Sequence, residues 1–561
     1  MAGNLVGSPP TGWTADCDQL AGSPGGWTLS GGTLTHAGAD TSGCASDAFA
    51  VTPGELLYVA ATGSGSITAG ARFRVAFGGS SSFASGAVTS YSDIVTGQDF
   101  AASGQVYDGF VTVPAAVTHA RLVVYNLAAG ACVWSSVKAR RLSDLTAPTV
   151  KVEVAFGRAS NYANNGILTW KVGAANSDNR VGSSFLCPRA GGTLDVTEWS
   201  DVSAACQSAS ITRGRRTRTD EYETGQCTLV LDNSQRDFDP LNTNASADWV
   251  INGVSYVGTG RPVRVSLVDG DTGDEYRLFT GRATSWVPAW DGGGDASWVT
   301  IQAAEYLLEL NKPIAETTFA SARTDVLLGA MLDALDWPAA LRRIDTGTVT
   351  APEITVSGSI LGYLRLCATT ELGRLYLAGD GSVRFRIGST WRTANVQATF
   401  DPASTVGAFG LDYERAAIAY DLDLLRNRVA GTRYGVGAAG SVVSDNADSI
   451  ASYGTHGYEV TDLLFQTGAE VRTWTEAVLA ANASPVARVS EVEVWPLVNS
   501  AWWGLLQWAD FGDRYTVKVE PPPQGSDVIT QTVQLESLRW DIRPNVEGGV
   551  RVVLGLVPAG T

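Results

Sequence analysis

The residues most able to bind a metal or catalyse a reaction lie in 224–240, TGQCTLVLDNSQRDFDP. This stretch begins as a strand and ends in a run of aspartates. Asp232, Asp237 and Asp239 could belong to a calcium loop or to a pair of catalytic carboxylates. An EF-hand loop needs oxygen ligands at positions one, three and five and glycine at six. Counted from Asp232, Arg236 stands at position five and Asp237 at six, so the pattern fails. We interpret the stretch as a strand end followed by an Asx-type turn.

Other signatures of catalysis are missing from the sequence. It contains no G-x-x-x-x-G-K-[ST], no H-E-x-x-H and no G-x-S-x-G pattern. The three histidines, His36, His119 and His456, lie far apart in the chain, which leaves little material for His-based catalysis. The seven cysteines form no C-x-x-C pair, which argues against zinc. We therefore expect no enzymatic activity, no metal site and no cofactor.

Composition narrows the class of protein further. A chain of 561 residues should form roughly three or four domains. Its formal net charge of −17 disfavours non-specific binding to DNA or to anionic membranes. The N-terminus has no signal-peptide pattern, and no apolar run approaches the roughly 20 residues of a membrane-spanning helix. We expect neither stable nucleic-acid binding nor an integral membrane protein.

Two residue clusters could contact a partner. The basic run comprises Arg213, Arg215, Arg216 and Arg218, and three acidic residues follow it within five positions. We interpret this run as a solvent-exposed strand or as a contact with the acidic surface of a neighbouring subunit. The second cluster is Trp502, Trp503 and Trp508. Exposed tryptophans would mark a partner or membrane site, but we expect these to form core beneath the last strands.

Residues 1–145 consist mainly of small residues with widely spaced aromatic ones. Alternating runs broken by Gly, Ser or Pro predict strands at 26–30, 48–61, 71–77, 107–114, 119–127 and 131–142. Trp27 and Trp134 fall in these alternating patterns and are expected in the core. The pattern is typical of a β-sandwich and resembles that of the jelly-roll carbohydrate-binding modules.

That resemblance implies a sugar-binding face. An aromatic ring stacks on the apolar face of a pyranose, and nearby Asp, Asn or Arg side chains bind its hydroxyl groups. Trp13, Tyr91 and Tyr107 lie in turns or at strand ends, where they should be exposed, and Asp93 lies near Tyr91. We expect weak glycan binding through Trp13, Tyr91, Asp93 and Tyr107. The alternative is a spacer, or a contact with neighbouring proteins.

In the rest of the chain, the spacing of apolar residues changes from strand-like to helical and back. Residues 146–312 are rich in strands, whereas 313–397 contain two helical segments, 324–338 and 359–373, and a hairpin that turns at 379–381. Gly373 is expected at the C′ position of the second helix. Residues 398–561 return to strands, with one helix near 468–482 and two long strands at the end that should pair.

A succession of short motifs then carries a family resemblance over residues 150–561. In order, the motifs are EWSDVS (198–203), RGRRTRTDEYETGQCTLVLDNSQRDFDPLN (213–242), GRPVRVSL (260–267), YRLFTGRATSW (276–286), VTIQAAEYLLEL (299–310), LGRLYLAGDGSVRFR (372–386), DSIASYGTHGYEV (448–460) and DFGDRYTV (510–517). This order resembles the minor tail proteins of long-tailed actinobacterial phages, specifically the tail hub. That family is similar to the baseplate hub of contractile tails.

The resemblance implies a mainly-β structural protein of the virion, made in the host cytoplasm and located at the tail tip. Its expected domains are a jelly-roll β-sandwich (1–145), a first barrel-like hub domain (146–312), a small mixed α/β insert (313–397) and a second barrel-like hub domain with one helix (398–561). Hub proteins form a trimeric ring that links the tail tube to the host-binding apparatus and lets DNA pass. The implied partners are two further copies of the chain, the distal tail protein, the tape measure, fibre or spike proteins and host cell-wall glycans.

Two other classes compete with the hub. A distal tail protein forms a hexameric ring and can also carry a carbohydrate-binding module, but it would be shorter and lack the helix–hairpin unit of 313–397. A tail-associated glycan hydrolase would need two carboxylates roughly 5–10 Å apart in a cleft, and no motif in 150–561 marks such a pair.

Overall fold

The computed structural model of the protein has a mainly-β fold, which confirms the predicted fold class. It describes residues 14–559 except 17–26, 31–32, 37–41, 47, 66–70, 80–87, 99–104, 127–130, 142–146, 157–169, 172–178, 181–198, 217–219, 244–248, 252–253, 271–272, 293–295, 312, 389–395, 403–410, 421, 497–500, 522–527 and 545–548. None of the described helices is long and apolar enough to cross a membrane.

The first part of the chain is a two-sheet sandwich. One sheet has the order β1 (Thr14–Asp16), β4 (Ser42–Ala45), β10 (His119–Asn126), β7 (Ala71–Gly78) and β8 (Val88–Gln98), with β5 (Phe49–Ala50) beside β10. The other has the order β2 (Trp27–Ser30), β3 (Thr33–His36), β11 (Cys132–Arg141), β6 (Leu56–Gly65) and β9 (Gln105–Thr112). Alternate residues of both sheets fill the core, and Trp134 is fully buried in it, as its alternating position predicted.

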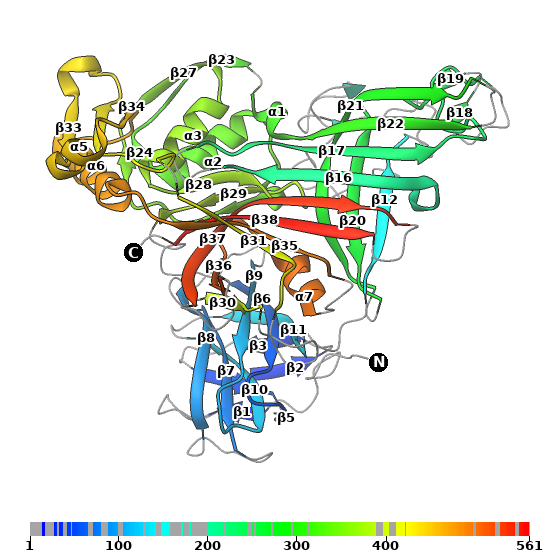
Figure 1. Cartoon of the computed structure of the whole chain (residues 1–561), viewed down its shortest axis with the longest axis horizontal. Coiled ribbons are helices and arrows are strands. Elements are labelled where there is room, and N and C mark those ends of the chain that lie inside the picture. Colours follow the sequence, from blue (N-terminus) through cyan, green and yellow to red (C-terminus); the bar gives the residue numbers. More distant parts are fainter. Residues whose placement is uncertain are drawn as a thin grey trace.

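A single open sheet dominates the rest of the molecule (Figure 1). Its strands run in the order β15 (Ser200–Asp201), β12 (Thr149–Val154), β20 (Pro262–Val268), β21 (Glu275–Trp290), β22 (Ser297–Glu305), β17 (Glu223–Asp232), β16 (Cys206–Gly214), β37 (Ile529–Ile542), β38 (Val550–Pro558), β35 (Arg488–Val494) and β31 (Arg415–Ala419). β36 (Arg514–Val519) pairs with β37, and β30 (Val396–Phe400) pairs with β36. Two short hairpins are separate from it: β13 (Trp170–Lys171) with β14 (Asn179–Arg180), and β18 (Val250–Ile251) with β19 (Val254–Ser255).

This sheet joins the two segments that the sequence suggested as separate barrel-like domains. β16, from the first segment, pairs with β17 on one side and with β37, from the second, on the other; Ile211 lies opposite both Cys227 and Trp540. Among the described strands no sheet closes into a barrel, because the pairing of β16 with β37 uses the edges that would have to meet within each segment. The two long C-terminal strands, β37 and β38, pair as predicted.

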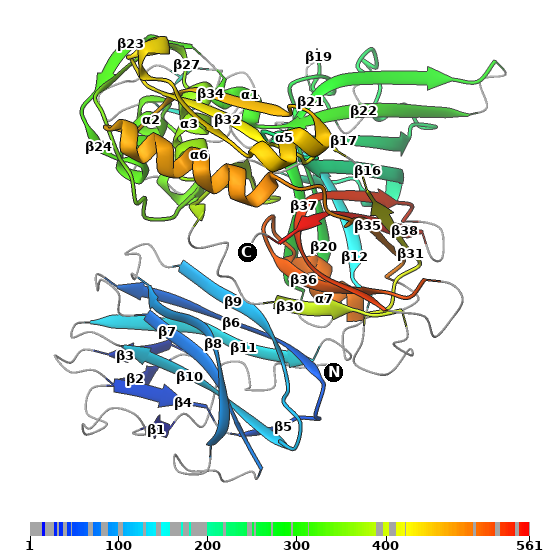
Figure 2. The same ribbon diagram turned by 60° about the vertical axis from the view of Figure 1, so that its left-hand side comes forward.

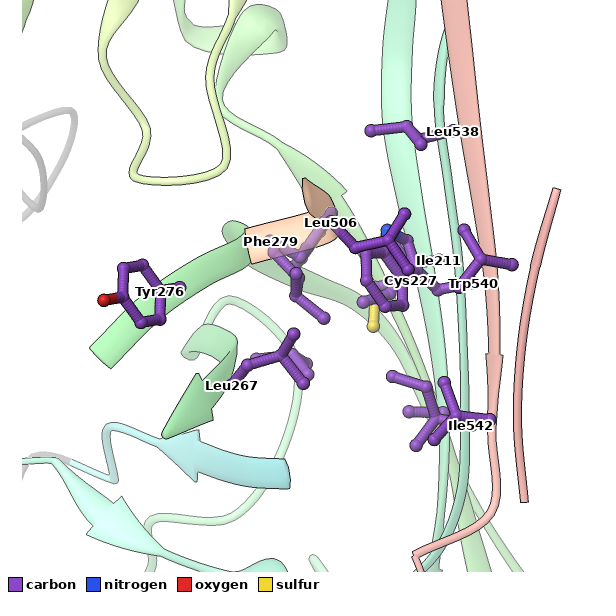
Figure 3. Close-up of a cluster of buried hydrophobic side chains, with 14 of the residues drawn as sticks. Ile211, Cys227, Leu267, Tyr276, Phe279, Leu506, Leu538, Trp540 and Ile542 are labelled. Atoms are coloured by element: carbon purple, nitrogen blue, oxygen red, sulfur yellow. The ribbon is translucent and has the colours of Figure 1, made fainter. Parts of the chain in front are cut away.

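The core of the large sheet lies on one of its faces. Ile211, Cys227, Leu538 and Trp540 point to this side, where helix α7 (Ala501–Trp508) also contributes Leu506 (Figure 3). In the same helix Trp502 and Trp503 are buried and Trp508 is partly buried, so the interpretation of this cluster as core is confirmed. The sequence analysis had not predicted that the cluster is helical.

Residues 307–387 form the mixed insert. Its elements are α1 (Leu307–Leu310), β23 (Pro313–Phe319), β24 (Ala322–Arg323), α2 (Thr324–Ala334), β25 (Arg342–Ile344), β26 (Thr350–Ala351), β27 (Ile354–Ser359), α3 (Leu361–Thr370), β28 (Arg374–Leu377) and β29 (Val383–Arg386). Both predicted helices and the hairpin are present. The C′ residue of α3 is Leu372, with φ +51°, and not Gly373. Gly373 follows it, donates its N–H to Ala368 O, and has no room for a Cβ, which would lie 2.2 Å from Arg386 O.

The segment that follows packs on the insert. It contains β32 (Arg428–Arg433), β33 (Val442–Asp445), α5 (Ala447–Tyr453), β34 (Gly457–Leu463) and α6 (Gly468–Asn482). α6 is the predicted helix; it starts with a capping box between Thr467 and Glu470, and its Trp474 donates a hydrogen bond to Thr369 O of the insert. With α5 and α7, residues 398–561 contain two described helices that the sequence analysis missed.

Figures 1 and 2 show how these parts are arranged. The insert and α6 lie at one end of the large sheet, and β17, β21 and β22 extend from the other end. The sandwich lies on the side of β30, which contacts β9.

Tyr107 provides a test of the sandwich core. Its side chain is 4% exposed and its ring centroid lies 5.4 Å from that of Trp134. Replacing Tyr107 with Ala should lower the free energy of unfolding by about 3–5 kcal/mol, because it leaves a cavity in the core. Urea unfolding of the full chain measures this, with Thr112→Ala at the exposed end of the same strand as the control. Equal stability of the two variants would contradict the placement of Tyr107.

Candidate functional site

The face of the large sheet opposite the core is polar. On β22, β17 and β16, the residues Gln302, Thr228 and Ser210 lie in one row across the sheet, and the row continues on β37 and β38 through Asp541 and Arg551. All five side chains are exposed or partly exposed. Their neighbours on the same face have similar chemistry: Ser208, Thr212, Gln226, Thr300 and Ser537.

Charged residues on this face pair with one another. Arg551 donates from Nε and Nη2 to the two carboxylate oxygens of Glu493, at 2.7 and 2.9 Å, and from Nη1 to Asp541 at 3.2 Å. The hydrogen bond from Arg551 lowers the pKa of Glu493. Ser210 donates to Asp541 at 3.0 Å. Because these groups are partly exposed, the pairs add little stability, but they keep the local charge close to balanced.

Where the large sheet meets the insert, a buried ionic network is centred on Glu536. Its carboxylate accepts hydrogen bonds from Arg215 Nε at 2.8 Å, from Tyr222 OH at 2.7 Å and from Arg374 Nη2. Burial alone would raise its pKa. The charges of Arg215 and Arg374, together with hydrogen bonds from Arg215 and Tyr222, outweigh burial and lower the pKa of Glu536 to about 2.

A second buried pair lies beside the first. Arg213 Nε donates to Glu305 Oε1, and its Nη2 donates to Leu377 O of the insert. Glu305 also accepts from Gly225 N–H at 3.1 Å. Burial raises the pKa of Glu305, because its one arginine partner compensates less of the desolvation than the two arginines beside Glu536 do.

A half-open cleft of about 420 Å³ borders this network. Arg215, Tyr222 and Arg374 contribute to its lining, together with residues of α3, β34 and α6. At its rim, Arg365 pairs with Glu221 at 2.6 Å and donates to Tyr222 O at 3.0 Å. Of the residues proposed for glycan binding, Tyr91, Asp93 and Tyr107 do not line this cleft.

These contacts correct the interpretation of the basic run. Arg213 and Arg215 are not solvent-exposed, because each lies in a buried ion pair that holds the large sheet to the insert or to a distant part of the same sheet. Arg216 is exposed and pairs with Asp423, and Arg218 lies outside the described residues. No local pattern marks these two arginines as buried, since their carboxylate partners are 92 and 321 residues away.

The aspartate run is a turn, as interpreted from the sequence. Asp232 accepts a hydrogen bond from Ser234 N at 2.9 Å, Asn233 accepts from Phe238 N at 2.8 Å, and Asp239 accepts from Leu241 N at 2.9 Å. The hydrogen bonds from Ser234 lower the pKa of Asp232. Among the described residues no group of three or more His, Cys, Asp or Glu side chains is placed to hold a metal ion.

The four residues proposed for glycan binding do not form one site. Tyr107 is buried in the core and not exposed, because it occupies an inward-facing position of β9, together with Val111. Trp13 lies outside the described residues. Tyr91 and Asp93 do lie together on β8 and are partly exposed.

Both β8 residues contact arginines of the neighbouring strand β7. Arg72 donates to both carboxylate oxygens of Asp93 at 3.2 Å, and the guanidinium of Arg74 lies 3.9 Å from the ring centroid of Tyr91. The sequence analysis missed these arginines, although their alternation in ARFRVAF places both on the same side of the strand.

No protein-family model and no curated protein matches the sequence. Among solved structures, the chain is similar to the 43 kDa tail protein of prophage MuSo2 from Shewanella oneidensis (11% identity, TM-score 0.42, 64% of this chain and 96% of that one). It is also similar to a tail protein from Neisseria meningitidis MC58 (11% identity, TM-score 0.42, 64% and 93%). A family 16 carbohydrate binding module covers 24% of this chain and 99% of its own, with 15% identity and a TM-score of 0.17.

Removing the charge of Glu536 should lower the stability of the fold strongly. Glu536→Gln keeps the size of the side chain but leaves Arg215 and Arg374 buried without their counter-ion. We expect a loss of about 3–5 kcal/mol in the free energy of unfolding, measured by urea denaturation followed by tryptophan fluorescence. Glu491→Gln is the matched control, because Glu491 lies in the same sheet and pairs with Arg415 at the surface. A loss no larger than the control's would contradict the role given to Glu536.

The same carboxylate predicts a pH dependence. The pKa of Glu536 is lowered in the folded chain from 4.5 to about 2, so its ionised form stabilises the fold above about pH 4.5. This contribution, roughly 3 kcal/mol, should be lost as the pH falls from 4.5 towards 2. The stability difference between wild type and Glu536→Gln, measured from pH 6 to 2.5, should therefore shrink as the pH falls. A constant difference would show that Glu536 does not carry the effect.

Proposed function

We propose that this protein is a structural component of a phage tail tip, in which three copies form a ring around a channel for DNA. The observation that carries the proposal is the largely polar face of the large sheet, which extends across strands from both hub segments. The motif order of residues 150–561 supports the same class of protein.

The chemistry of this face suits a channel. The eight strands β21, β22, β17, β16, β37, β38, β35 and β31 contain no lysine, and the arginines on this face, Arg282, Arg415, Arg539 and Arg551, pair with carboxylates. DNA phosphates bind surfaces that release counter-ions, and a face of hydroxyls, amides and balanced charges offers little of that attraction. DNA could therefore pass without being retained.

The size of the face is also suitable. Three copies of eight strands, placed side by side around an axis, make twenty-four strands. At about 4.8 Å per strand the ring is roughly 37 Å across at the backbone, and strand tilt widens it further. That leaves space for a DNA duplex inside the layer of side chains.

In this proposal the ring links the tail tube to the host-binding apparatus, and the chain acts in the virion without catalysing a reaction. Its neighbours would be the distal tail protein, the tape measure and fibre or spike proteins. A hexameric distal tail protein is the alternative. The insert favours the hub, because a distal tail protein would lack it. Here the insert is joined to the large sheet by buried contacts of Arg374 with Glu536 and of Leu377 O with Arg213.

The oligomeric state tests the proposal. The purified chain, or the complex recovered from tail tips, should have the mass of three chains and threefold symmetry in images of the tip. Sedimentation velocity and electron microscopy give both quantities. Six copies would favour the distal tail protein, and a monomer within intact tips would exclude a ring.

We further propose that the sandwich makes a weak contact with glycans of the host cell wall at β8. The supporting observation is that Tyr91, Asp93 and Arg72 lie side by side, partly exposed, on β8 and the adjoining strand β7. A ring beside a charged hydrogen-bonding pair is the combination that binds a sugar.

Binding of the full chain to host cell walls tests this contact. Tyr91→Ala combined with Asp93→Ala should weaken binding about tenfold, whereas Thr89→Ala, at an exposed position of the same strand, should not. Trp13→Ala is tested separately. Unchanged binding in the double variant would reject this contact, and release of soluble sugar from the walls would favour the hydrolase alternative.

A further inference from the structure

Among the described strands, the run of eight strands ends on one side in β31, which has one neighbour, and on the other side in the last part of β21, which has one neighbour after Ala283. On one side, β20 pairs with β21 only as far as Arg282, and Ala283 bonds to Gly260 and Arg261, whereas β22 pairs with β21 up to Trp290. Among the described strands, residues 284–290 thus form an open edge, here called the β21 edge. On the other side, β31 pairs only with β35 within the described part of the chain, and residues 415–420 form the β31 edge.

Both edges expose large apolar side chains. Val287 and Trp290 are 53% and 48% exposed at the β21 edge, and Ile418 and Tyr420 are 42% and 71% exposed at the β31 edge. Soluble proteins usually protect an open strand edge with lysine or other charges. The β21 edge has no charged residue, and the β31 edge has only Arg415, at its start. Exposed apolar groups beside unpaired backbone therefore indicate contact surfaces.

Among the described strands, the two edges do not pair with each other within one chain. Seven strand spacings separate β21 from β31, which is roughly 34 Å across the sheet. Neither edge has a second partner strand among the described residues, so each can take one from outside the chain. Every copy of the chain carries one β21 edge and one β31 edge. A second copy would therefore present the complementary edge to each edge of the first.

The polarity and the faces of the two edges are compatible. All neighbouring strands in the run are antiparallel, so the first and the eighth run in opposite directions. In a rotational ring they would meet as another antiparallel pair. Register also places Trp290 and Ile418 on the core side of the sheet, and Val287 and Ala417 on the polar side. A contact between the edges would thus continue both the core side and the polar side of the sheet from one copy to the next.

We propose that copies of this chain join head to tail, with the β21 edge of one copy paired to the β31 edge of the next. The inference rests on the ring proposed above and identifies its contact surfaces. Pro288 has no N–H and interrupts the row of donors on the β21 edge, so few backbone hydrogen bonds can form there. Burial of Trp290, Val287, Ile418 and Tyr420 must supply most of the attraction.

The test uses one variant for each edge of the full chain. The first carries Val287→Lys and Trp290→Lys, the second carries Ile418→Lys and Tyr420→Ser, and Val443→Lys is the control at an exposed position of a different sheet. Sedimentation velocity measures mass, and thermal unfolding confirms that each variant folds like the wild type. Each edge variant should fall from three chains to one, whereas the control should stay at three.

Mixing the two edge variants makes the test specific. One variant retains the β31 edge and the other the β21 edge, so an equimolar mixture should form dimers and stop there. A mixture that stays monomeric, or edge variants that remain trimers, would overturn this contact while leaving the ring itself in place. A wild-type chain that is monomeric at every concentration and in tail tips would overturn the ring as well.

Discussion

The arrangement of the molecule depends on one buried carboxylate. Glu536 is 1% exposed and binds Arg215 and Tyr222, from the loop between β16 and β17, and Arg374, from the insert. A buried charge that loses its partners costs several kcal/mol, so these segments must be in place together. The ends of the large sheet, the loop after β16 and the insert are thereby fixed relative to one another.

The backbone is shaped to allow this contact. The pairing of β37 with β38 shifts register between Leu535 and Ser537, and this bulge lets both Leu535 and Glu536 be buried. Opposite the bulge, Gly214 has φ +116°, and a Cβ there would lie 2.2 Å from Glu536 O. Arg215 N–H donates to the same oxygen at 2.9 Å. Only glycine permits the two strands to approach so closely while the arginine turns inward.

The sequence predicted the parts of the fold that depend on the local spacing of apolar residues. Alternation located most strands, and the helical spacing located α2, α3 and α6, because these patterns need no knowledge of distant residues. Tyr107 was misplaced even though alternation was available. Its strand begins at Gln105, so Tyr107 shares the inward face with Val111 rather than lying at an exposed strand end.

A second group of features that the sequence did not predict depends on pairing across long separations. Nothing local to Arg213 or Arg215 distinguishes a solvated arginine from a buried one, since the distinction lies in Glu305 and Glu536. The same holds for the pairing of β16 with β37, which turns two expected barrel-like units into one sheet. The contact between Tyr91 and Arg74 could have been inferred only by assigning both strands to one sheet in the correct register.

The buried charges and the open edges make different demands on the same sheet. An ion pair in the interior is sensitive to geometry and adds little net stability over apolar packing, so its main effect at the junction is to fix one arrangement of insert and sheet. The edges at the two sides of the sheet instead expose apolar side chains with few directional constraints. In a ring of such copies, most of the turn from one copy to the next would be set inside the chain, because seven of every eight strand spacings lie within a copy. In the proposed ring, the number of copies would therefore be determined by the packing around Glu536 and the core beneath the sheet, and the edge residues would determine how tightly the copies hold together.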